Sequence, residues 1–347
     1  SRSTGSMTRL GCLALSIAAF LSACSPAPLA PSPSAAPAAS ATNAPTAIPP
    51  SETPTVTPTP DPYAGLTLLD LAARTYGGGS LREGEALADA LDYTRYAIDY
   101  DSDGLRVFGF LDRPHGGGPF PVVLVLHGYV PTEGYSIQTY TARYAAWLAR
   151  LGFLVIHTNY RNYPPSDVGP NLFRVGYAID VLNLAAIVRA QAGEPGPLES
   201  ADGARIGLFG HSMGGGIALR VITIDPEIRA AVLYGSMSGN ERWNYEKILE
   251  WSDGERGLEE WAVPDADMVR IGAIEYLDRI EAAVSIHHGA ADPTVPPEWS
   301  ADLCARLEGL GRQPECFSYP GQPHTFYGDT DAQFMGRVGE FFNRTLR

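Results

Sequence analysis

Short apolar runs alternate with longer segments of helical spacing along the chain from Tyr63 onward. Continuous apolar runs of four or five residues are typical of strands buried on both faces of a sheet. Segments with apolar residues three or four positions apart predict helices. Strands are predicted at residues 122–126, 153–157, 206–209, 231–234, 284–287 and 315–319, and helices at 140–151, 172–190, 215–222 and 337–347. Because predicted strands and predicted helices alternate, we expect an α/β fold with a mainly parallel, doubly wound sheet.

Two further segments depart from this alternation. Residues 93–100 and 105–111 predict an antiparallel N-terminal hairpin, because an Asp-Ser-Asp-Gly turn sequence joins two strand-like runs. The segment 236–282 separates two predicted strands and is rich in Trp and Tyr. It could form a helical cap over a site, or helices whose aromatic residues pack on the body.

The first 62 residues have a different character. Arg9 precedes an apolar run over residues 10–23, which suits a signal-peptide core better than a membrane span. The run ends in Leu-Ser-Ala before Cys24, which resembles a bacterial lipobox. This resemblance predicts a lipoprotein signal peptide over 7–23 and Cys24 as the lipidated N-terminus of an exported cell-envelope protein. An ordinary secretory signal with a chance cysteine is the alternative.

Two flanking segments complete the predicted domain organisation. Residues 1–6 precede Met7 and are expected to be a cloning remnant. Residues 24–62 consist mainly of Pro, Ala, Ser and Thr, so they have too little apolar surface to fold and predict a disordered, extended linker. Residues 63–347 then form a single catalytic domain.

The remaining cysteines also bear on export. Only Cys304 and Cys316 lie in the body of the chain. Since an exported chain meets an oxidising compartment, we expect a disulfide between them, with two free buried thiols as the alternative. No Cys/His cluster has the spacing of a zinc site, so no metal is expected.

Charge narrows the choice of partners. The chain has 25 basic and 39 acidic residues, for a net charge of −14. A duplex nucleic-acid binder would need a basic face, and an acidic surface is not attracted to anionic lipid. We therefore expect no nucleic-acid partner, and contact with a membrane only through the lipid anchor.

The most informative motif is Gly210-His211-Ser212-Met213-Gly214, which lies between a predicted strand and a predicted helix. A strand, a tight turn and a helix form a nucleophile elbow, which presents a serine hydroxyl clear of the sheet. Glycines are needed at both ends because the turn is strained and neighbouring backbone lies close. Ser212 is therefore the candidate nucleophile.

A serine nucleophile needs a histidine base and an acid that orients the histidine. At elbows of this kind, the acid and then the histidine follow the serine along the chain. Asp292 follows one predicted strand and His324 follows a later one. We expect Ser212, Asp292 and His324 to form a catalytic triad, although histidines are also present at 287–288.

An oxyanion hole needs two backbone N–H groups that point to the developing negative charge. We expect one from Met213, directly after the nucleophile, and one from Tyr129, in the loop after the predicted strand 122–126. The Tyr129 side chain could also reach the pocket. His127 and His211 are expected to support the loop and the elbow rather than act as bases. This chemistry requires no cofactor.

Together these motifs resemble the α/β-hydrolase superfamily. Within it, the chain is similar to the catalytic domain of the prolyl-oligopeptidase family and to dienelactone-hydrolase-like enzymes. The resemblance covers residues 93–345 and rests on the blocks at 103–111, 121–128, 159–161, 210–215, 288–296 and 323–324. It implies the α/β-hydrolase fold and a serine hydrolase with the triad named above.

Two departures from the peptidases of that family favour a simpler reaction. Those peptidases usually carry a β-propeller, whereas only residues 63–92 lie between the linker and the hairpin. The chain also has His127-Gly128-Tyr129 where many relatives have His-Gly-Gly. Ester hydrolysis demands only an activated serine, an oxyanion hole and an acyl pocket.

We therefore expect a carboxylesterase that acts on short-acyl or aryl esters. One alternative is a serine exopeptidase on short peptides, with Glu133, Arg161, Asp167 or Glu241 as the anchor for a substrate terminus. The other is a non-catalytic envelope binding protein that kept a hydrolase fold.

Overall fold

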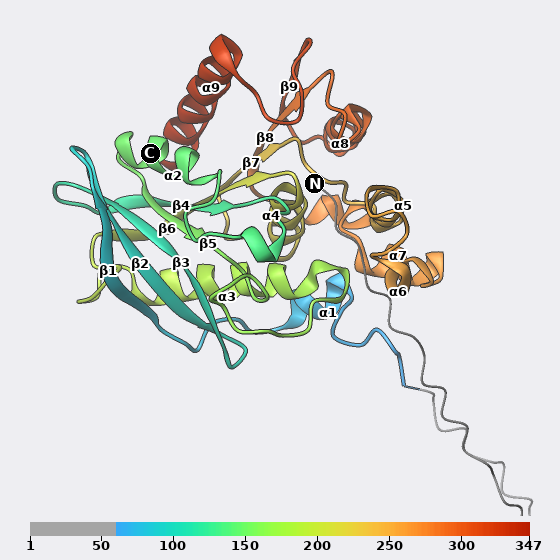
Figure 1. The fold of residues 1–347 in the computed structure, drawn as a ribbon, viewed down its shortest axis with the longest axis horizontal. Helices are drawn as coiled ribbons and strands as arrows, with labels where there is room; N and C mark the ends of the chain where they lie inside the picture. The colour runs from blue at the N-terminus through green and yellow to red at the C-terminus, as the bar shows by residue number, and fades with distance from the viewer. Residues whose placement is uncertain (1–59) are drawn as a thin grey trace, which may run out of the picture. The chain divides into compact units, whose positions relative to one another are not determined.

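The computed structural model describes residues 60–347 (Figure 1). The predicted remnant 1–6, the signal peptide 7–23, the lipidation site Cys24 and the linker as far as residue 59 lie outside these described residues. Between residues 60 and 347, no helix combines the length and apolar character needed to cross a membrane.

A nine-stranded sheet with the order β1-β2-β3-β5-β4-β6-β7-β8-β9 runs through the described part of the chain. The first three strands and β5 pair antiparallel, and the strands from β5 to β9 pair in parallel. The strands are β1 Leu81–Asp89, β2 Tyr93–Ser102, β3 Leu105–Pro114, β4 Phe120–Leu126, β5 Leu154–Thr158, β6 Ala201–His211, β7 Ala230–Tyr234, β8 Ala283–Gly289 and β9 Glu315–Tyr319. The predicted fold class, a mainly parallel sheet with an antiparallel hairpin, is confirmed.

Helices cover both faces of this sheet, as Figure 1 shows. The helices are α1 Leu68–Ala73, α2 Ala142–Arg150, α3 Val175–Gln191, α4 Met213–Ile224, α5 Glu241–Trp251, α6 Leu258–Trp261, α7 Asp265–Ile271, α8 Pro297–Gly309 and α9 Gly328–Leu346. Three short 3₁₀ segments, Thr132–Gly134, Leu172–Arg174 and Ile274–Arg279, join them. Helices α3 and α4 pack on one face, and α2 and α9 pack on the other.

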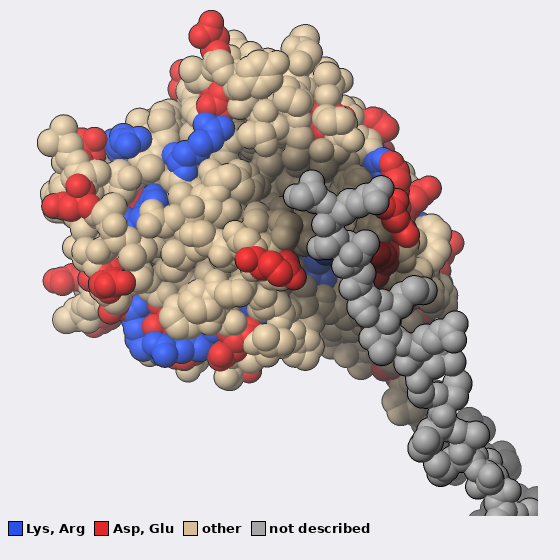
Figure 2. Space-filling view, in the orientation of Figure 1, with Lys and Arg blue, Asp and Glu red and all other residues tan. Residues whose placement is uncertain are grey.

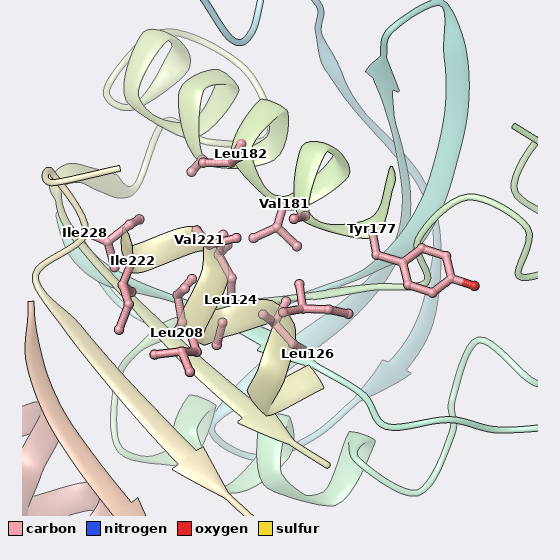
Figure 3. Packing of buried hydrophobic residues seen from close by; sticks show 14 of the residues in the cluster. Leu124, Leu126, Tyr177, Val181, Leu182, Leu208, Val221, Ile222 and Ile228 are labelled. Atoms are coloured by element: carbon pink, nitrogen blue, oxygen red, sulfur yellow. The ribbon is translucent and has the colours of Figure 1, made fainter. Parts of the chain in front are cut away.

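The central strands are apolar throughout because both of their faces are buried. In β4, Leu124 faces the core under α3 and α4, whereas Val123 faces the core under α2 and α9. Figure 3 shows Leu124 and Leu208 near Val221 of α4. Each strand therefore ends at a fixed position between two helical layers, and the loops at the carboxyl ends of the strands are held in place.

Three elements differ from the predictions. β1 was not predicted, because most of its side chains are exposed and its pairing with β2 is interrupted around residues 83–88, which removes a regular alternation. Helix α8 was also not predicted. Helix α9 begins at Gly328 rather than at residue 337, because its first turn is polar and acidic.

The predicted disulfide is confirmed: Cys304 of α8 is bonded to Cys316 of β9. The bond joins a helix to the edge strand of the sheet, with the two Cα atoms 6.4 Å apart. It lies in the part of the chain between two of the predicted triad residues, Asp292 and His324.

The segment 236–282 folds into α5, α6, α7 and a 3₁₀ turn. Some of its aromatic residues pack on the rest of the domain: Tyr245 meets Phe173 edge-on at 5.7 Å, and Trp243 stacks on Trp299 of α8 at 6.2 Å. Other residues of the segment, including Trp251, line a cavity described below. The segment thus both packs on the body and forms one wall of a cavity.

Candidate active site

Ser212 occupies the sharp turn between β6 and α4. Its backbone has φ 57° and ψ −119°, a strained conformation for a residue with a side chain. The turn needs the flanking glycines, because a Cβ on Gly210 would lie 2.3 Å from the carbonyl oxygen of Gly214. A Cβ on Gly214 would lie 2.1 Å from the carbonyl oxygen of Leu126, at the end of β4. Strand, strained turn and helix form the expected nucleophile elbow.

Asp292 and His324 come together at the carboxyl ends of β8 and β9. His324 Nδ1 lies 2.7 Å from Asp292 Oδ2, and the other oxygen, Oδ1, accepts hydrogen bonds from the backbone N–H groups of Thr294 and Val295. Burial alone would raise the pKa of Asp292, but hydrogen bonds from His288 and His324 outweigh it and hold this pKa well below its ordinary value. Asp292 is therefore an ionised, fixed acceptor that orients the His324 ring.

Ser212 and His324 line one cavity, so the structure brings the three predicted triad residues to one site. No hydrogen bond joins Ser212 Oγ to His324 within the described residues. Such catalytic hydrogen bonds are often long without substrate and tighten in the complex. Gly235 leaves room for the ring, since a Cβ there would lie 3.2 Å from His324 Nδ1.

The neighbouring histidines have other partners. His287 is fully buried between Ser285 and the hydroxyl of Tyr319, and burial lowers its pKa to about 3. His288 Nδ1 lies 2.6 Å from Ser300 Oγ, and its Nε2 lies 3.1 Å from Asp292 Oδ2. His288 thus contacts the same oxygen of the predicted triad acid as His324 does, a supporting role that sequence reasoning did not assign.

The loop after β4 lies beside the nucleophile. A Cβ on Gly128 would lie 3.0 Å from Ser212 Cβ. Tyr129 and Met213 both line the cavity, and among residues 60–347 nothing accepts a hydrogen bond from either backbone N–H. Both amides are therefore available to an oxyanion. The Tyr129 hydroxyl accepts a hydrogen bond from Arg256 of the 236–282 segment.

The two histidines that were predicted to be supports are buried, and each has both ring nitrogens engaged. His127 lies between the carbonyl oxygens of Gly128 and Asn159, and burial lowers its pKa to about 4. His211 lies between Tyr140 and the carbonyl oxygen of His324, and burial lowers its pKa to about 3. The nitrogens of both rings lie against these groups, and none of them is hydrogen-bonded to Ser212 within the described residues.

The cavity beside Ser212 has a volume of about 880 Å³. Its wall has an aromatic part, which includes Tyr140, Tyr177, Tyr245 and Trp251, and a polar part from residues 252–260 and from residues 171–174, which precede α3. Figure 2 shows acidic side chains gathered over the side of the molecule where α5 lies. The size fits an organic substrate well beyond an acetyl group.

The four candidate anchors for a peptide terminus do not line this cavity. Glu133 is exposed on a 3₁₀ turn, and Asp167 accepts a hydrogen bond from the backbone N–H of Arg106. Arg161 is buried in a salt bridge with Asp180.

Glu241, the fourth candidate, is buried and bound by Arg174, Arg220 and Asn244. Of these partners, Arg174 lines the cavity. Sequence spacing could not have found this group, because its members come from the 3₁₀ segment Leu172–Arg174, α4 and α5.

No cluster of three or more His, Cys, Asp or Glu side chains within residues 60–347 is arranged to hold a metal ion.

Two family models match the chain. The prolyl oligopeptidase family model matches residues 197–347, and the alpha/beta hydrolase fold model matches residues 121–262. None of the curated proteins has a significantly similar sequence.

Several solved structures are similar in fold. Acetyl xylan esterase 1 from Thermoanaerobacterium sp. JW/SL YS485 is 20% identical, with a TM-score of 0.56 over 78% of this chain and 91% of that chain. The esterase Pf2001 of Pyrococcus furiosus is 17% identical, with a TM-score of 0.56 over 79% of this chain and 100% of that chain.

Peptidases are similar over a smaller share of their own length. A puromycin-hydrolyzing peptidase of Mycobacterium tuberculosis is 21% identical, with a TM-score of 0.57 over 77% of this chain but 39% of that chain. At these identities the likeness concerns the fold alone. The chain thus has the α/β-hydrolase fold, and over residues 197–347 it resembles the prolyl oligopeptidase family.

Proposed function

We propose that the chain is a serine carboxylesterase in which Ser212, His324 and Asp292 form the catalytic triad. The observation that carries this proposal is the 2.7 Å contact between Asp292 and His324 beside the cavity that Ser212 also lines. A carboxylate, an imidazole and a strained serine at one cavity are the groups that acyl transfer needs.

In the proposed reaction, Ser212 Oγ attacks the ester carbonyl carbon while His324 Nε2 takes the hydroxyl proton. The charge that develops on the carbonyl oxygen is stabilised by the backbone N–H groups of Met213 and Tyr129. His324 then gives its proton to the departing alcohol, which leaves an acyl-enzyme. Water repeats the sequence and releases the acid, and throughout Asp292 stabilises the imidazolium form of His324.

Two observations favour an ester over a peptide. The four anchors suggested from the sequence do not line the cavity, and two of them, Arg161 and Glu241, lie in buried salt bridges. An ester also has a better leaving group than an amide and so demands less of the site. The serine exopeptidase remains the second candidate, because peptidases are among the similar structures.

The first test compares kcat/KM on p-nitrophenyl esters of rising acyl length with kcat/KM on aminoacyl and prolyl p-nitroanilides. Ser212→Ala serves as the blank. Ester turnover that depends on Ser212, with negligible anilide turnover, supports the esterase. Comparable turnover of both classes would make the protein a peptidase.

A fluorophosphonate probe separates an enzyme from a binding protein, because it labels activated serines. We expect labelling of the wild-type protein and none of Ser212→Ala. Absence of labelling in both, together with absence of turnover, would favour the non-catalytic binding protein.

We also propose that the protein is exported and held at a bacterial cell envelope by lipid on Cys24. The basis is the Leu-Ser-Ala-Cys sequence after an apolar run of signal-peptide length. Metabolic labelling with an alkyne fatty acid should mark the wild-type protein and not Cys24→Ser. Equal labelling of both proteins would refute lipidation at this residue.

A further inference from the structure

A short series of hydrogen bonds connects three parts of the site that lie far apart in the sequence. The backbone N–H of Gly128 donates to the hydroxyl oxygen of Tyr140 at 3.0 Å. That hydroxyl lies 2.6 Å from Nδ1 of His211, and His211 Nε2 lies 3.0 Å from the carbonyl oxygen of His324. The series therefore runs from the loop after β4, through the elbow, to the loop that holds the proposed base.

Chemistry permits only one arrangement of the protons in this series. The carbonyl oxygen of His324 can only accept, so His211 Nε2 carries the proton. His211 is buried and neutral, because burial lowers its pKa to about 3, so its Nδ1 must accept. Tyr140 therefore donates its hydroxyl proton to His211 and accepts from Gly128 on its oxygen lone pair.

The ends of the series are positions that the proposed reaction depends on. Gly128 directly precedes Tyr129, whose N–H is a proposed oxyanion donor. The other end is the backbone of His324, and the His211 and His324 rings also lie 4.7 Å apart. The loop that holds His324 makes one further hydrogen bond, from the backbone N–H of Phe326 to the Tyr234 hydroxyl at 2.5 Å.

We propose that Tyr140 and His211 are positioning residues that hold the oxyanion loop and the His324 loop in register with Ser212. This inference rests on the proposed function. Neither residue takes a proton from the substrate or the nucleophile, because both nitrogens of His211 and the hydroxyl of Tyr140 are already engaged. Their role is to keep the Tyr129 N–H and the His324 ring in fixed positions relative to Ser212.

The substitution Tyr140→Phe tests the proposal with the smallest change, since the ring that lines the cavity remains and only the hydroxyl is removed. An oxyanion donor acts mainly in the transition state, and removal of one costs about 10²–10³-fold in kcat. Because Tyr140→Phe loosens the donor rather than removes it, we expect kcat to fall about 10- to 100-fold with KM within about threefold.

Tyr135→Phe is the matched control. Its hydroxyl also comes from the connection between β4 and α2, but it donates to Asn159 Oδ1 at 2.8 Å and is outside the series. It does not line the cavity. We expect kcat of Tyr135→Phe to stay within about threefold of wild type.

Two more variants test the coupling. In His211→Gln the side-chain amide can donate an N–H to the His324 carbonyl oxygen as the imidazole does, whereas the side chain in His211→Ala cannot. The kcat of His211→Gln should therefore be at least fivefold higher than that of His211→Ala. The double variant Tyr140→Phe/His211→Ala should be little worse than His211→Ala alone, because both break one series. The proposal would be overturned if the loss of kcat in the double variant equalled the product of the two single losses, or if kcat of Tyr140→Phe stayed within threefold of wild type.

A readout without substrate separates this proposal from the proposed function. Hydrogen exchange of a peptide that contains Gly128 should be at least tenfold faster in Tyr140→Phe than in Tyr135→Phe. Equal exchange rates would refute the series of hydrogen bonds, whatever the activity. Absence of Ser212-dependent ester turnover, with faster exchange in Tyr140→Phe, would refute the proposed esterase and leave the positioning of the two loops supported.

Discussion

The buried cluster around Glu241 makes a quantitative prediction about stability. Glu241 begins α5 and is 5% exposed. One carboxylate oxygen accepts from Arg220 at 2.5 Å, and the other accepts from Arg174 and from Asn244. The side chains of Arg220 and Arg174 are 4% and 12% exposed, so water can replace few of the hydrogen bonds that they donate to the carboxylate. The cluster thus joins the 3₁₀ segment Leu172–Arg174 and the start of α5 to α4.

Glu241→Gln keeps the size and removes the charge. The two guanidinium groups then lose their shared counter-ion, and the amide NH₂ of the new side chain meets N–H donors. Breaking a buried pair by removal of one partner costs about 3–5 kcal/mol, because the remaining charge stays buried. We expect a loss of that size in the free energy of unfolding, a large part of the ~5–15 kcal/mol that folded domains have.

Arg174→Met is the comparison within the same cluster. It leaves one guanidinium, that of Arg220, with one carboxylate, so the positive and negative charges of the cluster become equal in number. We expect it to cost less than half as much as Glu241→Gln. Urea unfolding followed by circular dichroism gives both values, and tryptophan fluorescence reports on α5 through Trp243 and Trp251. A loss under about 1 kcal/mol for Glu241→Gln would refute the reasoning.

Three further predictions concern acid, reduction and the elbow. In the unfolded chain His127 and His211 bind protons below about pH 6.5, whereas in the folded protein burial lowers their pKa values to about 4 and about 3, so the free energy of unfolding decreases as pH falls from 6.5. Between pH 5.5 and 4.5 each histidine should lower it by about 1.4 kcal/mol per pH unit. A urea midpoint that does not change over this range would contradict the prediction. Cys304→Ser removes the bond to Cys316, which closes a loop of about a dozen residues, and should lower stability by about 2–3 kcal/mol; a Tm equal to that of wild type would count against it. Gly214→Ala puts a methyl group 2.1 Å from a backbone carbonyl oxygen at the end of β4, so we expect a loss of about 3 kcal/mol or more and esterase activity reduced at least 100-fold; near-normal activity would disprove the close approach.

Local patterns were sufficient to predict the sheet and the order of the proposed catalytic groups. The apolar runs of the central strands are long enough to be recognised because both faces of each strand are buried, as in β4. The strained turn at Ser212 could be anticipated because glycine is required on both sides of it. The same patterns missed β1, whose mostly exposed side chains carry no alternation, and the polar first turn of α9.

The sequence alone determined which residue types were present at strand ends and in what order: a serine at an elbow, then an aspartate, then histidines. The position of His324 after a later predicted strand favoured it among the downstream histidines, but the sequence could not show which ring contacts Asp292 from the cavity. Tertiary structure decided it: His287 is enclosed by the sheet, His288 supports the acid from one side, and His324 reaches it at 2.7 Å.

Tertiary structure also decided what holds the site together. Tyr140 meets His211 across 71 positions of sequence, and Glu241 meets Arg174 across 67. Such contacts require the sheet to bring separate loops to one edge, so no local spacing encodes them. The sequence therefore determined the reactive groups, whereas the packing of distant segments determined their partners and their geometry.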